Sequence, residues 1–246
     1  MRLFGLIGKP LTHSFSKGYF NTFFQENGIR DHRYENFELD QINALTDLVG
    51  SQSGLAGLNV TIPYKEVVLP YLHFQDEVVQ SVGACNCIKI SAGQLFGFNT
   101  DVIGFRESLR SRLKSHHNKA LILGTGGAAK AVAYILKQLD IEYLTVSRKT
   151  HSDSLSYEEV NAEMLADHTL IVNTTPLGMY PHLETYPHID YSKLSSAHLL
   201  YDLVYNPEKT SFLQQGEANG ATILNGYEML LIQAKESWRI WNDQTC

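Results

Sequence analysis

Residues 119–147 constrain the fold of this chain more than any other segment. An apolar run at 120–123 ends in the sequence Gly-Thr-Gly-Gly-Ala-Ala, and apolar residues then recur at helical spacing. A second run follows at 143–147, about as far downstream as a β-α-β unit of roughly 30 residues requires. The segment therefore predicts a strand, a tight glycine turn, a helix and a second strand.

The glycine turn predicts a site for the diphosphate of a dinucleotide. Gly124 would allow the sharp turn, and Gly126 would let a diphosphate approach the backbone at the helix N-terminus. Ala129 would keep helix and strand close, and Gly127 and Ala128 complete the candidate set. Such turns also serve as ordinary connections, but the order strand, turn, helix and strand favours dinucleotide binding.

The end of the second strand bears on which dinucleotide is bound. Proteins selective for NAD usually place an acidic residue there, whereas this chain has Ser147, Arg148, Lys149 and Thr150. Two cations and two hydroxyls suit the 2′-phosphate of NADP. A solvated basic turn is the alternative, but attachment to the glycine turn favours NADP.

Composition narrows the class of protein. With 246 residues and 43% hydrophobic content, the chain can form one large or two modest domains, and its alternating patterns predict α/β architecture. A net charge of −6 argues against nucleic-acid binding, and no apolar run approaches a membrane span. Ten scattered histidines predict no metal site. The odd set Cys85, Cys87 and Cys246 indicates a reducing compartment, hence the cytoplasm.

Polar residues near the start form the first group of candidates outside the glycine turn. Ser14 and Ser16 stand at the entrance of an amphipathic helix, where one of them is expected to cap and where both could bind a carboxylate. Asn59 and Thr61 lie two apart on a strand and share a face. Lys65 is expected in the first turn of a new helix, where a cation is unfavourable; a surface lysine is the alternative.

Further candidates lie at the ends of predicted elements. Residues 99–101, Asn-Thr-Asp, precede a helix predicted from 102 to about 113, and one of them is expected to cap it. Thr174 lies in a polar loop that ends a strand, where the nicotinamide half of a dinucleotide would lie. A helix is predicted around 157–165. In the final helix the stripe of Leu230, Ala234, Trp238 and Trp241 predicts core packing, and Gln233 alone would be a surface residue.

With these segments assembled, the sequence resembles the shikimate dehydrogenase family over nearly its whole length. The matching motifs, in chain order, are GKPLTHSFSK, GLNVTIPYK, GACNCI, GFNTD, GTGGAAKA, NTTPLGM, YDLVYNP and GYEMLLIQA.

The resemblance implies a two-domain α/β protein whose active site is the cleft between the domains. Residues 1–101 would form a shikimate-binding domain, 102–225 a Rossmann-type NADP domain, and 226–246 a helix that returns to the substrate domain. The implied activity is the NADP-dependent, reversible reduction of 3-dehydroshikimate to shikimate, on the route to chorismate and the aromatic amino acids. The partners would be small molecules, not nucleic acid or membrane, and the protein a monomer or homodimer.

The family's functional residues are carried over by position. The resemblance places the substrate carboxylate at Ser14, Ser16 and Tyr205, and the ring hydroxyls at Asn59, Thr61, Asn86, Asp101 and Gln233. It places Thr174 and Gly226 at the cofactor and makes Lys65 and Asp101 the catalytic pair. Reduction of a ketone needs such a pair, because the developing alkoxide must be stabilised and protonated, which a lysine ammonium can do.

Some positions depart from the family pattern, and other functions stay open. Cys85 and Cys87 flank Asn86 where other residues are usual, and Glu228 replaces a small residue, which could alter cofactor affinity. A quinate/shikimate dehydrogenase that also accepts NAD shares nearly all these motifs. A non-enzymatic sensor of NADP or shikimate would not need Lys65 and Asp101. A folate-linked dehydrogenase would not account for the serine and Asn-Thr-Asp motifs.

Overall fold

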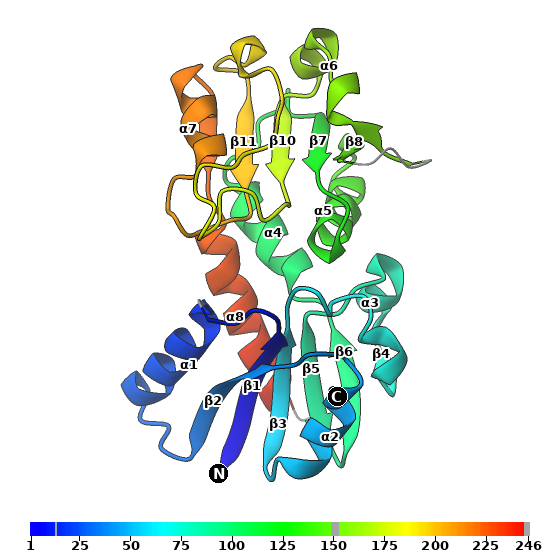
Figure 1. Ribbon diagram of the computed structural model, residues 1–246, viewed down its shortest axis with the longest axis vertical. Helices are drawn as coiled ribbons and strands as arrows, with labels where there is room; N and C mark the ends of the chain where they lie inside the picture. Colours follow the sequence, from blue (N-terminus) through cyan, green and yellow to red (C-terminus); the bar gives the residue numbers. More distant parts are fainter. Residues whose placement is uncertain (13, 149–152, 244–246) are drawn as a thin grey trace. The chain divides into compact units, whose positions relative to one another are not determined.

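The chain divides into two compact units. The computed structural model describes residues 1–12, 14–148 and 153–243. One unit comprises Met1–Thr100 with Ala234–Cys246, and the other comprises Asp101–Gln233. Each unit contains a six-stranded sheet with helices packed against it, which confirms the predicted α/β class (Figure 1).

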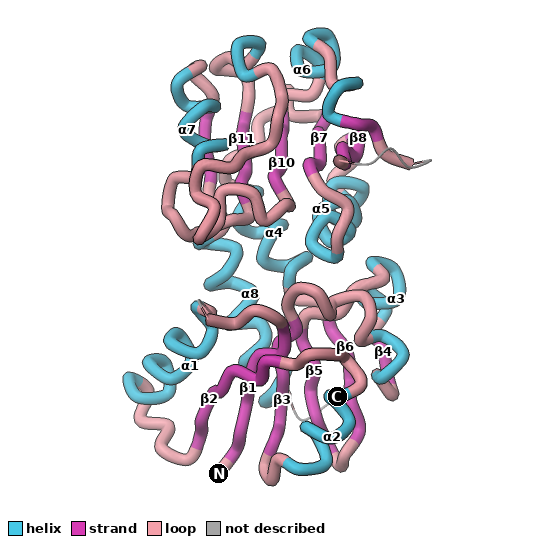
Figure 2. Tube along the Cα trace, viewed as in Figure 1, coloured by secondary structure: helices cyan, strands magenta, loops and turns pink. Residues whose placement is uncertain are grey.

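The first unit is built on a mixed sheet, whose strands Figure 2 shows in magenta. Its strands are β1 (Arg2–Gly8), β2 (His32–Glu38), β3 (Leu55–Val60), β4 (Phe74–Gln75), β5 (Cys87–Ser91) and β6 (Gln94–Phe98). The order across the sheet is β2-β1-β3-β5-β6-β4. β1 pairs in parallel with β2 and β3, whereas β5 runs antiparallel to β3 and β6. The end of β3 that carries Asn59 therefore lies beside the start of β5.

Hydrophobic side chains cover both faces of this sheet. The helices of the unit are α1 (Phe15–Glu26), α2 (Ala44–Ser51), α3 (Glu77–Val82) and the later part of α8 (Tyr227–Asn242). Trp241 packs with Phe4 and Phe20 in one cluster, and its Nε1–H donates to the Ile88 carbonyl at 3.0 Å. Gly57 leaves room for its indole. The predicted core stripe of the last helix is confirmed at Ala234, Trp238 and Trp241.

The second unit is a parallel sheet of Rossmann topology. Its strands are β7 (Lys119–Leu123), β8 (Glu142–Ser147), β9 (Leu155–Ser156), β10 (Leu170–Asn173), β11 (Leu199–Asp202) and β12 (Thr222–Leu224). They run in the order β9-β8-β7-β10-β11-β12, which is 3-2-1-4-5-6 when β7 is counted as strand 1. β10 and β11 are buried along their whole length, as expected for a sheet covered by helices on both faces.

The helices of the second unit are α4 (Asp101–Arg110), α5 (Gly127–Gln138), α6 (Ala162–Asp167) and α7 (Ser211–Ala218). α5 buries Val132, Ile135 and Leu136, as its periodicity predicts. The single helix predicted around 157–165 is wrong. A 3-10 turn, η2 (Tyr157–Glu159), precedes α6, because the Asn161 side chain accepts from the Met164 N–H and so starts a new helix there.

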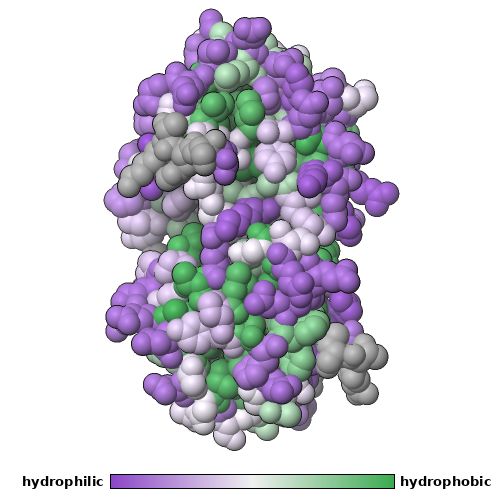
Figure 3. Space-filling view, turned by 90° about the vertical axis from the view of Figure 1, so that its right-hand side faces the viewer, coloured by the Kyte–Doolittle hydropathy of each residue, from purple (hydrophilic) through white to green (hydrophobic). Residues whose placement is uncertain are grey.

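Some hydrophobic residues remain at the surface. Ile62, Val67 and Phe74 are each at least half exposed, at 59%, 50% and 51%. Figure 3 shows hydrophobic residues interspersed with hydrophilic ones on one face of the molecule. Among the residues that the structure describes, no helix combines the length and apolar character that crossing a bilayer requires.

Candidate functional site

The glycine turn of the second unit lies at the point where the strand order reverses. β7 and β10 are neighbours in the sheet, and the chain leaves them toward opposite sides, which is where ligands bind in open α/β sheets. Gly124 follows β7 with φ +119°, and a Cβ atom there would collide with the Thr174 hydroxyl after β10. The structure thus brings together two residues that were predicted separately as cofactor ligands.

The start of α5 fits a phosphate group. Gly126 is the N-cap residue and makes no side-chain cap hydrogen bond, and the first turn carries no acidic residue. A Cβ atom on Gly126 would meet nothing within 4 Å, so the fold itself does not require glycine there. A helix N-terminus favours anions, and open space at its N-cap leaves room for one. Gly127 and Ala128, also predicted, are the first two residues of this helix.

The predicted 2′-phosphate segment follows β8. Ser147 is the last residue of that strand and pairs in register with Ser156 of β9, while Arg148 is exposed. Burial raises the pKa of Tyr157, and the positive charge of Arg148 opposes this shift. The Arg148 cation therefore lies near Tyr157 at this edge of the sheet, and its role toward a 2′-phosphate stays a prediction. The predicted ligand Lys149, and Thr150 with it, lie outside the described residues.

Gly226, another predicted cofactor residue, lies between β12 and α8. A Cβ atom at this position would overlap the Leu203 carbonyl group, and the Gly226 N–H donates to the Val204 carbonyl at 3.2 Å. Close approach of two backbone segments therefore accounts for glycine here. A role in cofactor binding stays a prediction.

The two predicted serines at α1 differ in their surroundings. Ser14 occupies the N-cap position, yet its side chain makes no cap hydrogen bond. Its Oγ atom is buried and has no hydrogen-bond partner within the part of the chain that the structure describes. Ser16 instead hydrogen-bonds to Tyr34, whose pKa is raised well above its ordinary value by burial. The expected capping role is not seen for Ser14, and an unpartnered hydroxyl at a helix N-terminus suits an anion.

Asn59 is held by two residues that the sequence interpretation missed. The Tyr34 hydroxyl donates to Asn59 Oδ1 at 2.8 Å, and Asn59 Nδ2 donates to Ser237 Oγ at 2.9 Å. Asn59 Nδ2 also donates to the Asn86 carbonyl at 3.4 Å, and because a carbonyl oxygen only accepts, this contact fixes which way the amide points. Ser237 is fully buried on the apolar face of α8. A single serine beside Ala234 and Trp238 was the feature of the sequence that could have identified it.

Asn86 is almost completely buried, with 2% of its surface exposed. Its Oδ1 accepts from the Thr100 N–H at 2.6 Å, and its Nδ2 donates to Thr100 Oγ1 at 3.0 Å. Asn99 in turn donates to the Ala84 carbonyl at 2.8 Å. These bonds tie the segment before β5 to the segment before α4. The predicted contact of Asn86 with a ring hydroxyl stays a prediction.

The helix predicted to begin before Lys65 does not form. The Val68 N–H donates to the Tyr64 carbonyl at 3.0 Å, which closes a single turn, and a 3-10 turn follows at η1 (Leu69–Tyr71). Pro70 lacks the N–H that an α-helix would need there. The argument from the helix dipole therefore does not apply to Lys65. Its carbonyl accepts from the Cys85 N–H at 2.7 Å, so the Lys65 turn lies beside the segment that carries Asn86.

Asp101 and Gln233 lie on two helices that pack closely within the second unit. Asp101 is the first residue of α4 and is 1% exposed. A Cβ atom on Gly104, one turn later, would lie 2.8 Å from the Met229 carbonyl oxygen and 3.4 Å from Gln233 Cβ. Glycine at 104 therefore lets α4 approach α8 where the two predicted polar residues stand.

The predicted residues are distributed over both units. Those in the first unit are Ser14, Ser16, Asn59, Thr61, Lys65 and Asn86, and those in the second are Asp101, Tyr205, Gln233 and the described cofactor candidates. No cluster of three or more acidic, histidine or cysteine side chains suited to a metal occurs among the described residues.

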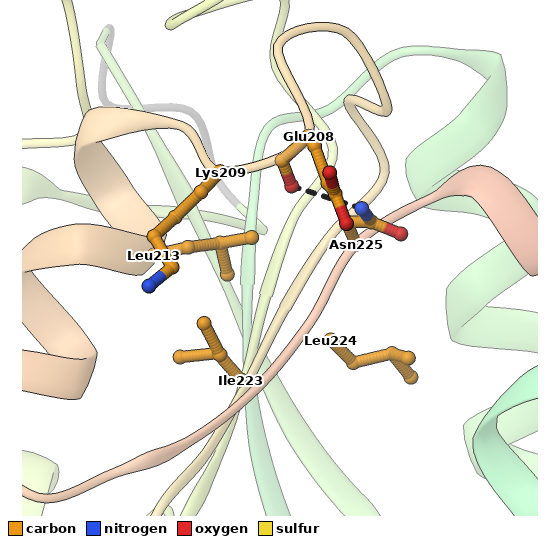
Figure 4. A pocket seen from close by; sticks show the side chains of 6 residues that line it. All are labelled: Glu208, Lys209, Leu213, Ile223, Leu224 and Asn225. Atoms are coloured by element: carbon orange, nitrogen blue, oxygen red, sulfur yellow. Dashed lines mark hydrogen bonds between the residues drawn. The ribbon is translucent and has the colours of Figure 1, made fainter.

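A pocket in the second unit is lined by none of these candidates, although Gly226 directly follows its lining residue Asn225. Its volume is about 460 Å³, and Figure 4 shows its lining of Glu208, Lys209, Leu213, Ile223, Leu224 and Asn225. Asn225 Nδ2 donates to the Glu208 carbonyl at 2.9 Å across its rim. The pocket lies at β12, the edge strand, and β10 and β11 separate β12 from the glycine turn after β7. It contains none of the predicted ligands.

Comparisons with known proteins agree on one family. Residues 6–88 match the family model described as the shikimate dehydrogenase substrate binding domain. The chain is 35% identical to the shikimate dehydrogenase (NADP(+)) of Caldicellulosiruptor bescii, over 99% of this chain and 90% of that protein.

Solved structures give the same result for the fold. A shikimate 5-dehydrogenase from Thermus thermophilus, in complex with NADP(H) and shikimate, has a TM-score of 0.86 and 29% identity, covering 98% of this chain and 94% of that one. A quinate dehydrogenase from Corynebacterium glutamicum in complex with NAD has a TM-score of 0.82 and 28% identity, covering 98% of this chain and 93% of that one.

Proposed function

This chain belongs to the shikimate dehydrogenase family, and on that premise we propose that it catalyses the NADP-dependent, reversible reduction of 3-dehydroshikimate to shikimate. This is a step toward chorismate and the aromatic amino acids. The observation that carries the proposal is the buried Ser14 hydroxyl at the start of α1, which has no hydrogen-bond partner among the described residues. The same chain has a glycine turn of the kind that binds dinucleotides. The first unit would bind the substrate and the second the cofactor.

NADP fits the residues of the second unit. The backbone of Gly126, Gly127 and Ala128 at the open start of α5 would hold the diphosphate. Ser147 and Arg148 would hold the 2′-phosphate, together with Lys149. Gly124, Thr174 and Gly226 would complete the site. When bound, the reduced cofactor supplies the hydride for the substrate ketone.

The substrate carboxylate is assigned to Ser14, Ser16 and Tyr205. The Ser14 hydroxyl is buried without a partner among the described residues, a costly arrangement that a bound carboxylate would relieve. The ring hydroxyls are assigned to Asn59, Thr61, Asn86, Asp101 and Gln233. Asn59 supports this assignment because its amide is held by Tyr34, Ser237 and the Asn86 carbonyl, and the last of these only accepts and so fixes its direction. Four of these five residues are neutral hydrogen-bonding groups and the fifth, Asp101, is an acceptor, which suits hydroxyls, whereas a cationic site would suit a second carboxylate.

Lys65 and Asp101 are assigned to the chemical step. The Lys65 ammonium would stabilise the negative charge that develops on the ketone oxygen and then donate a proton to it. Asp101 would orient the hydroxyl group and hold Lys65. Its near-complete burial strengthens its electrostatic effect, because charges interact more strongly away from water.

The direct test is an absorbance assay of cofactor reduction that crosses shikimate and quinate with NADP and NAD. Strong preference for shikimate with NADP supports the proposal. Comparable rates with quinate or NAD would favour a dual-specificity enzyme, a candidate supported by the similarity to the Corynebacterium glutamicum quinate dehydrogenase. No activity with any pair would favour a sensor of NADP or shikimate.

The proposal also includes a cytoplasmic location and either a monomer or a homodimer. Cys85 and Cys87 are buried thiols rather than a disulfide, which suits a reducing compartment. Light scattering coupled to size exclusion would distinguish the two oligomeric states.

A further inference from the structure

One buried carboxylate joins three elements of the second unit. Asp202 is the last residue of β11 and is 0% exposed. Its Oδ1 accepts from Asn173 Nδ2 and from the Val204 N–H, each at 3.0 Å, and its Oδ2 accepts from the Thr210 hydroxyl at 2.5 Å. An ionised carboxylate is an acceptor only, so three donors aimed at it match its charged form. Asp202 therefore links β10, the turn after β11 and the start of α7.

Asp202 and the loop after β10 hold opposite ends of the Asn173 amide. Because Asp202 accepts, Asn173 presents its amide nitrogen to it and turns Oδ1 toward the following loop. That oxygen accepts from the Thr175 N–H at 3.0 Å and from the Thr175 hydroxyl at 2.6 Å. The Thr175 hydroxyl oxygen accepts in turn from the Leu177 N–H at 3.3 Å. Residues 173–177 are thus linked through Asn173 to one buried carboxylate.

This loop forms one side of the glycine turn. Thr174 lies in it, and its hydroxyl donates to the Leu123 carbonyl at 2.8 Å and abuts Gly124. We infer that Asp202 is a positioning residue for the cofactor: its ionised carboxylate holds residues 173–177 in the shape that receives the nicotinamide half of NADP. The inference rests on the proposed function and adds to it a residue outside the set of ligands.

The carboxylate can change charge near neutral pH. Burial raises the pKa of Asp202 to about 7, against the opposing effect of its three hydrogen bonds. A proton on Oδ2 would turn that oxygen from an acceptor into a donor, and the bond to the Thr210 hydroxyl, the one partner of the three that can also accept, would have to reverse. The titratable group that acts on it from the neighbouring turn η3 (Tyr191–Lys193) is Tyr191, whose own pKa is raised, mainly by burial. Its contacts on the other elements, Asn173, Val204 and Thr210, are neutral.

The test compares NADP affinity in Asp202→Asn with the wild type by calorimetry, from about pH 6 to about pH 8.5. Asparagine has the shape of the neutral carboxyl group. The 2′-phosphate of NADP also titrates near pH 6. The informative quantity is therefore the dissociation constant of Asp202→Asn divided by that of the wild type at the same pH. The ratio should be close to one at the acid end and rise to about tenfold at the alkaline end, since a hydrogen bond to a charged group contributes about that much.

Two further variants make the result specific. Asp190→Asn removes an exposed carboxylate of the same unit that bonds to Ser192, and its ratio to the wild type should stay near one at every pH. Thr175→Val keeps the buried carboxylate but removes the hydroxyl that contacts Asn173, and it should reproduce the rising ratio. If Asp202→Asn fails to fold, the pH dependence of NADP affinity in Thr175→Val tests the inference in its place.

Amide hydrogen exchange in the cofactor-free protein gives an independent measurement. Protection of the Thr175 and Leu177 amides, corrected for intrinsic rates, should be lower in Asp202→Asn than in the wild type at alkaline pH. A ratio that stays constant with pH, with unchanged protection, would overturn the inference alone. Failure of the wild type to bind NADP at any pH would overturn the proposed function and this inference with it.

Discussion

The Thr174 hydroxyl would collide with the Cβ atom of any larger residue at position 124, and Gly124 itself has φ +119°. Thr174 is fixed in this position, because its hydroxyl and its N–H both donate to the Leu123 carbonyl, at 2.8 and 2.9 Å. The turn after β7 and the loop after β10 therefore pack closely against each other and are joined by hydrogen bonds.

Replacing Gly124 by alanine should impair both stability and cofactor binding. A non-glycine residue in this backbone region costs about 2 kcal/mol, and displacing Thr174 adds to that. Thermal denaturation and calorimetric NADP binding would measure the two effects. A Gly124→Ala protein with wild-type stability would contradict the steric relationship.

Gly126→Ala should separate binding from folding. The residue has φ −79° and open space around it, so alanine should change the free energy of unfolding by no more than about 0.5 kcal/mol. NADP affinity should fall at least roughly tenfold, because the added methyl group occupies the approach to the start of α5. Unchanged affinity for NADP would remove this helix start from the cofactor site.

Ser14→Ala should leave the fold intact and weaken substrate binding. Removing a buried hydroxyl that lacks a partner among the described residues should leave stability unchanged or raise it by up to about 1 kcal/mol. The Michaelis constant for shikimate should rise by about tenfold or more, since a hydrogen bond to a carboxylate is lost. Ser51→Ala, which removes an exposed hydroxyl bonded to the Leu48 carbonyl, is the matched control. Equal Michaelis constants in both variants would exclude Ser14 as a ligand.

Lys65→Met should lower turnover by roughly a hundredfold or more, the usual effect of losing a positioned acid. Steady-state kinetics with saturating shikimate and NADP would measure it. Lys209→Met removes an exposed lysine that pairs with Glu217 and should behave like the wild type. Near-normal turnover of Lys65→Met, with only a raised Michaelis constant, would show that Lys65 binds substrate without serving the chemical step.

Asp202 should make the protein less stable as pH rises. Its pKa is about 7 in the folded state and about 4 in the unfolded chain, so between these values the folded state binds more protons. Stability therefore falls with rising pH across this window. Denaturant unfolding at pH 5 and pH 8 should show Asp202→Asn gaining about 2 to 3 kcal/mol relative to the wild type between the two. A constant difference would place the pKa of Asp202 outside the window.

Local signals in the sequence predicted the second unit well. The segment from 119 to 147 carries its own strand, turn and helix pattern, and the structure has β7, α5 and β8 there. The errors of the sequence interpretation, in both units, were also local. The helix expected at Lys65 is prevented by Pro70, and the helix expected around 157–165 is interrupted by the Asn161 cap. Both residues were visible in the sequence, but their effect depends on neighbours that fix the backbone.

Contacts between distant residues could not be predicted in the same way. Tyr34, Asn59 and Ser237 meet only because β2 and β3 flank β1 and α8 packs across them. Asp202 ends an apolar strand, and nothing in that pattern shows that its partners come from positions 173, 204 and 210. Periodicity reports which face a residue occupies, whereas these networks depend on which elements become neighbours.

The first unit is discontinuous in the sequence, and this affects the order of folding during synthesis. Its core includes Trp241, which packs on Phe4 and Phe20, so β1 and α1 lack a central partner until the last helix has been made. The second unit is one continuous stretch from Asp101 to Gln233 and can close earlier. Domains usually fold on the ribosome from the N-terminus onward. Here β1 and α1 wait for the part of α8 that follows the whole second unit in the chain.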